Sequence, residues 1–162
     1  MITIRNLNEY DFGSIVGLND AEVQQTSQMD LDRLDQLVQM SSYCKVAVRD
    51  GQVAAFVIAL REEAPYENDN YSWFASHFPK FLYVDRVVVG SDFSGLKIGS
   101  MLYKDMFQFA RSHAISIITC EYNIEPPNPA SRAFHDKFGF RQVGTQWVAG
   151  GSKLVSLQAA ET

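Results

Sequence analysis

Apolar and polar residues follow one another along this chain with two different spacings. Ile2–Arg5 alternates apolar and polar side chains, which predicts a strand. Leu34, Leu37 and Val38 lie three and four positions apart and predict an amphipathic helix over 27–40. The other expected elements are, in chain order, a helical region over 9–19, strands over 44–49, 52–60 and 81–89, a helix over 99–114, a strand over 115–122, a short helix after Asn128, and strands over 141–148 and 153–158.

Asp50-Gly51 separates two of these strands and is a strong signal for a two-residue hairpin turn. Strands and helices are mixed along the chain, and no internal repeat or low-complexity linker divides it. The 162 residues are enough for one buried core. We therefore expect an α/β fold in a single domain over residues 1–162.

The segment Phe81–Tyr103 reads as a β-branched strand, a turn rich in Gly and Ser, and the start of a helix. Backbone amides in such a turn and in the first helical turn can bind a phosphate. Gly95 and Gly99 would keep side chains away from the anion, and Lys97 could add a positive charge. An ordinary turn followed by close helix packing is the alternative, because the P-loop and three-glycine dinucleotide patterns are both absent.

A second segment, Asn128–Phe140, reads as a short helix with favourable ends. Asn128 is a good N-cap, Pro129 suits the first helical position, and Gly139 predicts a left-handed helix end. In this order and at this distance, the two segments resemble the GNAT superfamily of acyl-CoA-dependent N-acyltransferases. The resemblance extends from about residue 45 to about residue 157.

This resemblance implies a three-layer αβα fold with a central mixed sheet, whose parallel strands splay to admit the pantetheine arm of coenzyme A. It also implies that acetyl-CoA is the cosubstrate and that the first segment binds its pyrophosphate. The family's pattern of Arg or Gln, two residues, Gly, one residue, and Gly or Ala falls on Ser94, Lys97 and Gly99, so only the last position matches. The residues implied to bind the cosubstrate are Val87, Val88, Val89, Ser94, Gly95, Leu96, Lys97, Ile98, Gly99, Ser100, Asn128, Ser131, Phe134 and Lys137.

The expected catalytic residues, Asp85 and Tyr83, lie on one face of the strand before the turn. Asp85 is the best-placed carboxylate for removing a proton from an amine. Tyr83 falls where some members of the resembling family carry a glutamate base. An Asp85 that faces solvent or compensates Arg86 is the structural alternative.

Phe134 stands where the resembling family carries a tyrosine general acid, and phenylalanine cannot donate a proton. Either the thiolate leaves without that help, another group such as His135, Tyr103 or Tyr122 substitutes, or the chain binds acyl-CoA without efficient turnover. We expect His135 to face solvent, because it is adjacent to Phe134 in the helix and points about 100° away.

Composition and charge limit the kinds of partner that we expect the protein to bind. The net charge of −5 argues against nucleic acid as a partner. No apolar run is long enough to cross a bilayer, and the N-terminal segment lacks the layout of a secretion signal, so we expect a cytoplasmic protein. Cys44 and Cys120 lie far apart and have no second Cys nearby, which argues against a zinc cluster or a disulfide, and no metal site is expected. We expect Cys120 to be a small buried hydrophobe.

The stretch 61–80 mixes carboxylates with aromatic residues. A connection of this length is usually a functional lid or a disordered insert, and the aromatic residues argue against disorder. They could line a site for a cationic amine, or they could instead complete the core or a contact between two copies of the chain.

We therefore expect an acetyl-CoA-dependent N-acetyltransferase in which a primary amine of a small molecule attacks the thioester directly. A non-catalytic acyl-CoA-binding sensor or partner module is the alternative, which Phe134 and the partial match to the phosphate pattern favour. A structural α/β domain with neither activity is a third.

Overall fold

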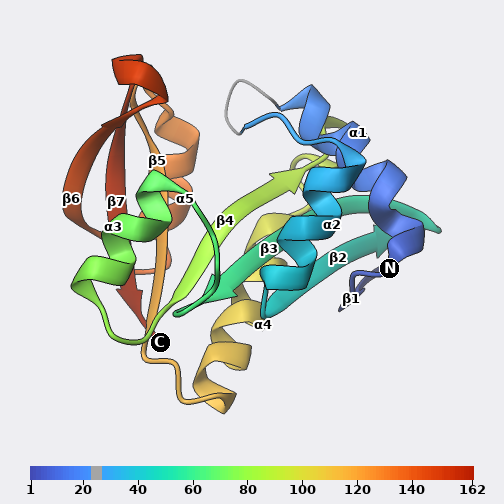
Figure 1. Cartoon of the computed structure of the whole chain (residues 1–162). Coiled ribbons are helices and arrows are strands. Elements are labelled where there is room, and N and C mark those ends of the chain that lie inside the picture. Colours follow the sequence, from blue (N-terminus) through green and yellow to red (C-terminus); the bar gives the residue numbers. More distant parts are fainter. Residues whose placement is uncertain (23–26) are drawn as a thin grey trace. The chain divides into compact units, whose positions relative to one another are not determined.

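The computed structural model describes residues 1–22 and 27–162 (Figure 1). They form two compact units, here called unit 1 (Met1–Leu60 and Val84–Gln108) and unit 2 (Arg61–Tyr83 and Phe109–Thr162). The α-helices are α1 (Phe12–Ala21), α2 (Leu31–Met40), α3 (Asp69–His77), α4 (Ile98–Ser112) and α5 (Pro129–Asp136). The strands are β1 (Ile2–Asn6), β2 (Tyr43–Arg49), β3 (Gln52–Arg61), β4 (Leu82–Val89), β5 (Ile117–Glu125), β6 (Arg141–Val148) and β7 (Lys153–Glu161).

Hydrogen bonds between the strands give the order β1-β2-β3-β4-β5-β7-β6. β2 is antiparallel to both β1 and β3, and β7 is antiparallel to both β5 and β6. β4 and β5 are parallel, with Leu82 opposite Ile118 and Tyr83 opposite Thr119. The expected α/β fold with a mixed sheet is thus confirmed, and the splay of its parallel strands stays a prediction.

Local sequence signals set the ends of these elements. Asp50 and Gly51 have φ angles of 51° and 79°, the left-handed pair that a tight hairpin turn between β2 and β3 requires. α2 begins at Leu31, later than the 27–40 range predicts, because the Asp30 side chain accepts a hydrogen bond from the Arg33 amide at 2.8 Å and caps the helix there.

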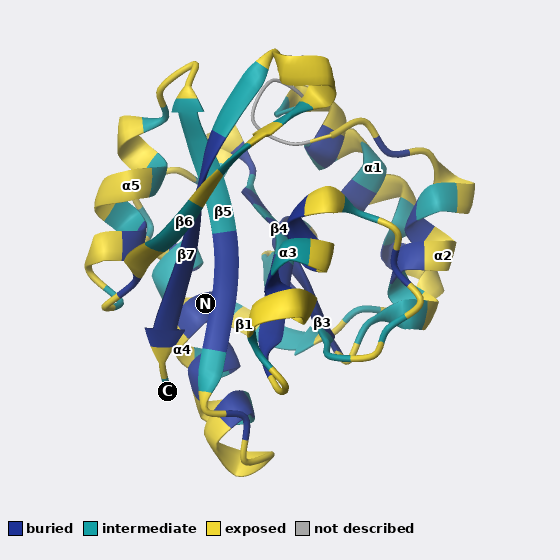
Figure 2. Ribbon diagram, turned by 60° about the vertical axis from the view of Figure 1, so that its left-hand side comes forward, coloured by how far each residue is buried: buried dark blue, intermediate teal, exposed yellow. Residues whose placement is uncertain are grey.

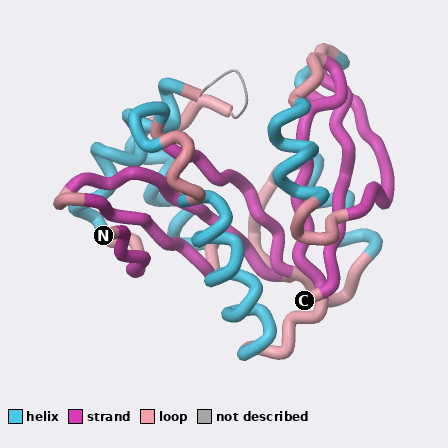
Figure 3. Tube along the Cα trace, turned by 180° about the vertical axis from the view of Figure 1, so that it is seen from behind, coloured by secondary structure: helices cyan, strands magenta, loops and turns pink. Residues whose placement is uncertain are grey.

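Unit 1 is built around β1, β2 and β3. α1 and α2 cover one face of these strands, and α4 covers the other (Figures 1 and 3). The buried apolar side chains of these two helices are Ile15 of α1 and Leu34 and Leu37 of α2, and each is 0% exposed. On the second face, the Tyr43 hydroxyl of β2 donates to Asp105 Oδ2 of α4 at 2.5 Å. Burial, together with this hydrogen bond, raises the pKa of Tyr43, so its hydroxyl stays protonated at neutral pH.

Unit 2 is built around β5, β7 and β6, with α3 and α5 on opposite faces of these strands (Figure 2). Adjacent residues of a strand point to opposite faces, so Glu121 and Tyr122 of β5 face different helices. Glu121 contacts Asn70 of α3, and Tyr122 contacts His135 of α5. Cys120 is buried, as expected, and its pKa is raised well above that of an exposed thiol by burial.

The stretch 61–80 contains the helix α3, which the sequence analysis did not predict. The role of this stretch as a lid or as the wall of an amine site stays a prediction. Asn68 caps α3 by accepting hydrogen bonds from the Asn70 and Tyr71 amides, both at 3.0 Å. Tyr66, Tyr71 and Phe74 are buried, and their rings pack in a chain that reaches Tyr83. For these three residues the structure supports the core alternative.

Gly144 of β6 is where α3 approaches the strands most closely. A Cβ atom at this position would lie 2.5 Å from Cζ2 of Trp73, whose ring stacks on His77 with centroids 3.7 Å apart. We expect Gly144→Ala to lower the free energy of unfolding by about 1–3 kcal/mol, because the tryptophan must move. Urea unfolding measures the change.

Gly17→Ala is the matched control. Gly17 lies in α1 and is exposed, and a Cβ atom added there would meet no other atom within 4 Å. This substitution should stabilise the protein by roughly 0.5–1 kcal/mol through helix propensity alone. Equal effects of the two substitutions would contradict the close packing of Trp73 on β6.

Candidate functional site

The turn between β4 and α4 has the backbone geometry of an anion site. Gly95 has a φ angle of +80° and Lys97 one of +60°, both in the left-handed region. A Cβ at Gly95 would meet no atom within 4 Å, so a ligand can approach the main chain there. α4 follows for 15 residues from Ile98, and its first amides lie at the positive end of the helix dipole. These features fit a diphosphate.

The residues of this turn differ in what they offer a ligand. Ser94, Gly95 and Lys97 are exposed, whereas the Ile98 side chain is in the core at 1% exposure. Ile98 and Gly99 can therefore contribute main-chain amides, and Lys97 a charge. The predicted binding roles of Val87, Val88, Val89, Ser94, Gly95, Leu96, Lys97, Ile98, Gly99 and Ser100 stay predictions.

The second segment forms α5 in unit 2. Asn128 caps it through Oδ1, which accepts from the Ser131 amide at 3.2 Å, and Pro129 is the first helical residue. This bond uses the oxygen of the Asn128 side-chain amide. A hydrogen-bond acceptor on a ligand would instead be bound by the nitrogen of that amide. The predicted cosubstrate contacts of Asn128, Ser131, Phe134 and Lys137 stay predictions.

His135 does not face solvent, so that expectation is wrong. The residue is 4% exposed, and its ring lies against Tyr122 and Phe140 with centroids 5.9 and 5.1 Å away. Nδ1 lies 2.7 Å from the Ser131 carbonyl oxygen, to which it donates as an N–H. Burial lowers the pKa of His135, so the ring is neutral at pH 7.

A pocket of about 390 Å³ lies in unit 2 between α5 and β5, β6 and β7. Asn128, Arg132 and Asp136 line it from α5. Ser156 and Gln158 of β7 line the opposite side and are joined by a hydrogen bond of 2.6 Å. Asn128 is the residue that this pocket shares with the predicted cosubstrate site.

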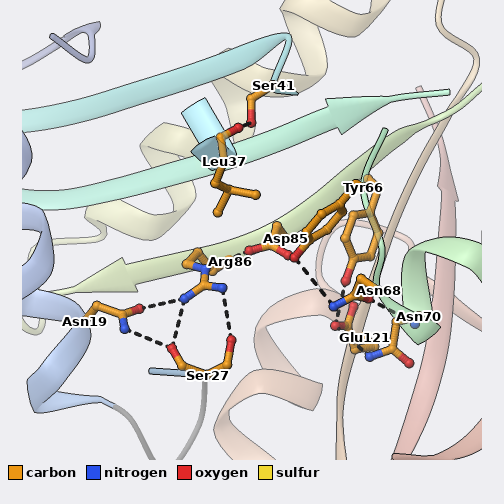
Figure 4. Close-up of polar contacts among 11 residues, drawn as sticks. Asn19, Ser27, Leu37, Ser41, Tyr66, Asn68, Asn70, Asp85, Arg86 and Glu121 are labelled. Carbon is orange, nitrogen blue, oxygen red and sulfur yellow. Dashed lines mark hydrogen bonds and ion pairs between the residues drawn. The ribbon is translucent and has the colours of Figure 1, made fainter. Parts of the chain in front are cut away.

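A carboxylate that the sequence analysis did not single out lies beside Tyr83. The Tyr83 hydroxyl donates to Glu121 Oε1 at 2.7 Å, and the Asn70 amide nitrogen donates to the same oxygen at 3.0 Å. Tyr83 is fully buried and Glu121 half-buried. The close-up in Figure 4 shows Asn70 and Glu121 turned toward one another. Glu121 is thus a carboxylate held in place by two uncharged donors.

One sequence signal could have identified Glu121. It is a charged residue within the apolar run that predicts a strand over 115–122. Tyr83 pairs with Thr119 in the parallel register, and residue 121 is two positions further on the same face of β5. The register itself, however, is not readable from one sequence.

Asp85 has a different environment in unit 1. Its Oδ2 lies 2.7 Å from Arg86 Nε, and the side chains of Asp85 and Arg86 are 3% and 5% exposed. The Arg86 guanidinium also donates to Asn19 Oδ1 at 3.1 Å and to the Ser27 carbonyl oxygen at 2.9 Å (Figure 4). This geometry favours the alternative in which Asp85 compensates Arg86. Its role as a base stays a prediction.

A mixed sheet flanked by helices, with a glycine-containing turn between a strand and the following long helix, agrees with the fold that the sequence analysis expects. The model of the family described as Acetyltransferase (GNAT) family matches residues 7–140, and the chain belongs to this family. It is accordingly an acetyltransferase, and acetyl-CoA is its cosubstrate.

Solved structures share this fold. Ard1 from Thermoplasma volcanium superposes with a TM-score of 0.81 at 15% identity, covering 99% of this chain and 97% of that one. Ribosomal-protein-alanine N-acetyltransferase from Brucella melitensis gives 0.75 at 21% identity, with 99% of each chain covered. The yncA protein from Salmonella typhimurium, solved with its cofactor acetyl-CoA, gives 0.74 at 16% identity and covers 99% of this chain and 94% of that one.

No curated protein matches the sequence. Of the helices within residues 1–22 and 27–162, none is both long and apolar enough to cross a membrane. In the same residues, His, Cys, Asp and Glu side chains form no group of three or more that could hold a metal ion.

The buried His135 should make stability depend on pH in a defined direction. Its pKa is lowered in the folded protein, so below the unfolded value of about 6.5 the unfolded state binds more protons. The free energy of unfolding should therefore fall as the pH drops below about 6.5, until the lower native pKa is passed. Urea titrations between pH 7.5 and pH 5 measure this loss.

His135→Phe keeps a ring against Tyr122 and Phe140 but cannot be protonated, so it should reduce the loss of stability across that window. His113, which is exposed, supplies the control, and His113→Gln should leave the dependence unchanged. An unchanged slope in His135→Phe would assign the proton uptake to another group.

Proposed function

We propose that this acetyltransferase acts on a primary amine and that Glu121 accepts the proton that the amine must lose. The observation that supports this role is the pair of uncharged donors on Glu121 Oε1, Tyr83 at 2.7 Å and Asn70 at 3.0 Å. Such donors favour the charged form of a carboxylate without neutralising it by an ion pair. Asp85, in contrast, is already engaged by the Arg86 guanidinium.

The cosubstrate would be bound by main-chain groups more than by side chains. Acetyl-CoA, when bound, supplies the acetyl group as a thioester. The amides of the turn over 94–100 would hold its pyrophosphate, and those of Val87, Val88 and Val89 its pantetheine arm. In unit 2, the Asn128 amide nitrogen would donate to an acceptor on the cosubstrate while the side-chain oxygen keeps the helix cap.

Proton removal is the step that the residues of unit 2 can carry out. An ammonium group cannot attack a carbonyl carbon, so Glu121 takes one proton and leaves a neutral amine. The amine nitrogen would then form its bond to the acetyl carbon as the bond from that carbon to sulfur breaks, and the second proton lost by the nitrogen would leave with the sulfur as the free thiol of coenzyme A. The Tyr83 hydroxyl, hydrogen-bonded to Glu121, holds the carboxylate in position during the transfer.

The acceptor we propose is a small cationic amine. The chain carries 19 acidic against 14 basic residues, and a negative potential favours the approach of a cation. A protein N-terminus is the competing class, in view of the similarity to the ribosomal-protein-alanine N-acetyltransferase of Brucella melitensis. Comparing kcat/KM for a panel of small amines with that for peptides of varied N-terminus tests the choice. Turnover of peptides alone would refute it.

A second candidate function is acyl-CoA binding without transfer. It is favoured by Phe134, whose ring packs on Phe138 at 5.3 Å between centroids and offers no proton. Tight binding of acetyl-CoA with no release of free thiol across the whole amine and peptide panel would support it.

Gly99→Asp tests the cosubstrate site. A carboxylate in the first turn of α4 would repel the pyrophosphate, so we expect the Kd of coenzyme A to rise about tenfold or more in calorimetric titration. Gln108→Glu adds a negative charge to an exposed position further along the same helix and should leave the Kd unchanged. If both variants bind as the parent does, the phosphates lie elsewhere.

Glu121→Gln tests the base. It keeps the shape of the side chain and removes its ability to accept a proton, so kcat should fall by about 10²- to 10⁴-fold while the Kd of acetyl-CoA is retained. Asp85→Asn is the matched variant, and its pH–rate profile should keep an acidic limb. If Glu121→Gln keeps its activity while Asp85→Asn is folded but inactive, Asp85 is the base.

A further inference from the structure

α3 lies between β3 and β4 in the chain and places one polar side chain against Glu121. Asn70, in its first turn, is 8% exposed and donates from Nδ2 to Glu121 Oε1 at 3.0 Å. We propose that Asn70 is a positioning residue for the reaction and that α3 serves to hold it. The inference rests on the proposed role of Glu121, because Asn70 would act only through that carboxylate.

The side-chain amide of Asn70 is fixed in one of its two orientations. Its nitrogen faces the Glu121 carboxylate, and its oxygen accepts from Gln146 Nε2 of β6 at 3.1 Å. A rotation by 180° would place the oxygen against a carboxylate and the nitrogen against another donor, so both contacts would become repulsive. Gln146 thereby selects the orientation of Asn70 that donates to Glu121.

The helix around Asn70 is held by contacts in its first turn and near its middle. Asn68 caps its first turn, and the Tyr71 hydroxyl donates to the Arg61 carbonyl oxygen at 2.5 Å and accepts from the Ala64 amide at 3.0 Å. Further along, Trp73 lies where a side chain at Gly144 would be. Asn70 is therefore carried by a helix with little freedom to shift, as positioning requires.

Two donors on one carboxylate oxygen restrict the side chain of Glu121 to a single geometry. Tyr83 comes from β4, Asn70 comes from α3, and Leu157 is the residue opposite Glu121 on β7. Of these neighbours only Tyr83 is titratable, and it donates as a neutral hydroxyl. The adjacent Cys120 is buried, and its raised pKa keeps the thiol neutral. Loss of Asn70 would remove a donor from the charged form without changing the charge nearby.

The test is a pH–rate profile of Asn70→Ala with saturating acetyl-CoA, together with a double-mutant cycle against Glu121→Gln. We expect kcat to fall about 10- to 100-fold and the acidic limb to move about 1–2 pH units higher, the equivalent of one hydrogen bond to a charged carboxylate. The KM for acetyl-CoA should not change. In the Glu121→Gln background, Asn70→Ala should cause no further loss.

Gln146→Ala provides a second route if Asn70→Ala folds poorly. Gln146 lies on a strand at the end of the strand order, and its loss leaves the Asn70 amide able to rotate. It should move the acidic limb in the same direction by a smaller amount. Ser72→Ala is the control, because it changes an exposed position of α3 without removing a donor from Glu121, and its limb should stay in place.

The outcomes separate the two proposals. If Glu121→Gln is inactive but Asn70→Ala keeps both its kcat and its acidic limb, the positioning role is refuted and the proposed base stands. If Asn70→Ala lowers kcat equally in both backgrounds, Asn70 acts on the fold and the inference fails. If Glu121→Gln is fully active, the proposed base is refuted and the inference fails with it.

Discussion

A carboxylate inside a sheet must be hydrogen-bonded, because an ionised group that loses its water without a partner would destabilise the fold. At Glu121, the oxygen Oε1 meets this requirement through side chains from two other elements, Tyr83 on β4 and Asn70 on α3. Asn70 is in turn held by Gln146 on β6. The hydrogen bonds of one half-buried carboxylate oxygen therefore link side chains from four strands and helices, all of them residues of unit 2.

Asp85 and Glu121 show that the hydrogen-bond partner of a carboxylate decides whether its charge is balanced by another charge. Asp85 pairs with a guanidinium, and the pair is nearly neutral as a whole, which suits the interior of unit 1. Glu121 Oε1 instead accepts from an alcohol and an amide, neither of which carries a charge. Such donors favour the charged form of a carboxylate without themselves cancelling its charge. Burial alone does not separate these cases, whereas the identity of the donors does.

Much of the fold could be predicted because its signals are local. The Asp50-Gly51 turn, the Asn128 cap and the alternation within the strands each depend on a few neighbouring residues. α3 could not be predicted in the same way, because the aromatic residues of 61–80 lie without a clear helical period and gain their burial from distant strands.

The candidate site could be predicted only in part for a similar reason. The turn before α4 and the cap of α5 could be singled out from the sequence, because turn and cap signals depend on adjacent residues. Their contacts with the cosubstrate stay predictions. The contact of Asn70 with Glu121 joins positions 51 residues apart and depends on strand register. His135 was placed wrongly because helical geometry gives the angle between neighbouring side chains but not which of them meets Tyr122.

If the turn before α4 binds the pyrophosphate as we propose, it recognises the ligand through conformation, since two left-handed residues and a helix start present amides that every amino acid except proline possesses. Side chains in such a turn are free to differ as long as the backbone can reach the same angles. A search for a fixed string of letters would therefore underrate this site, because only one of the three pattern positions matches. What the chain has to preserve there is a shape of the main chain, and glycine at position 95 is the residue through which that shape is encoded.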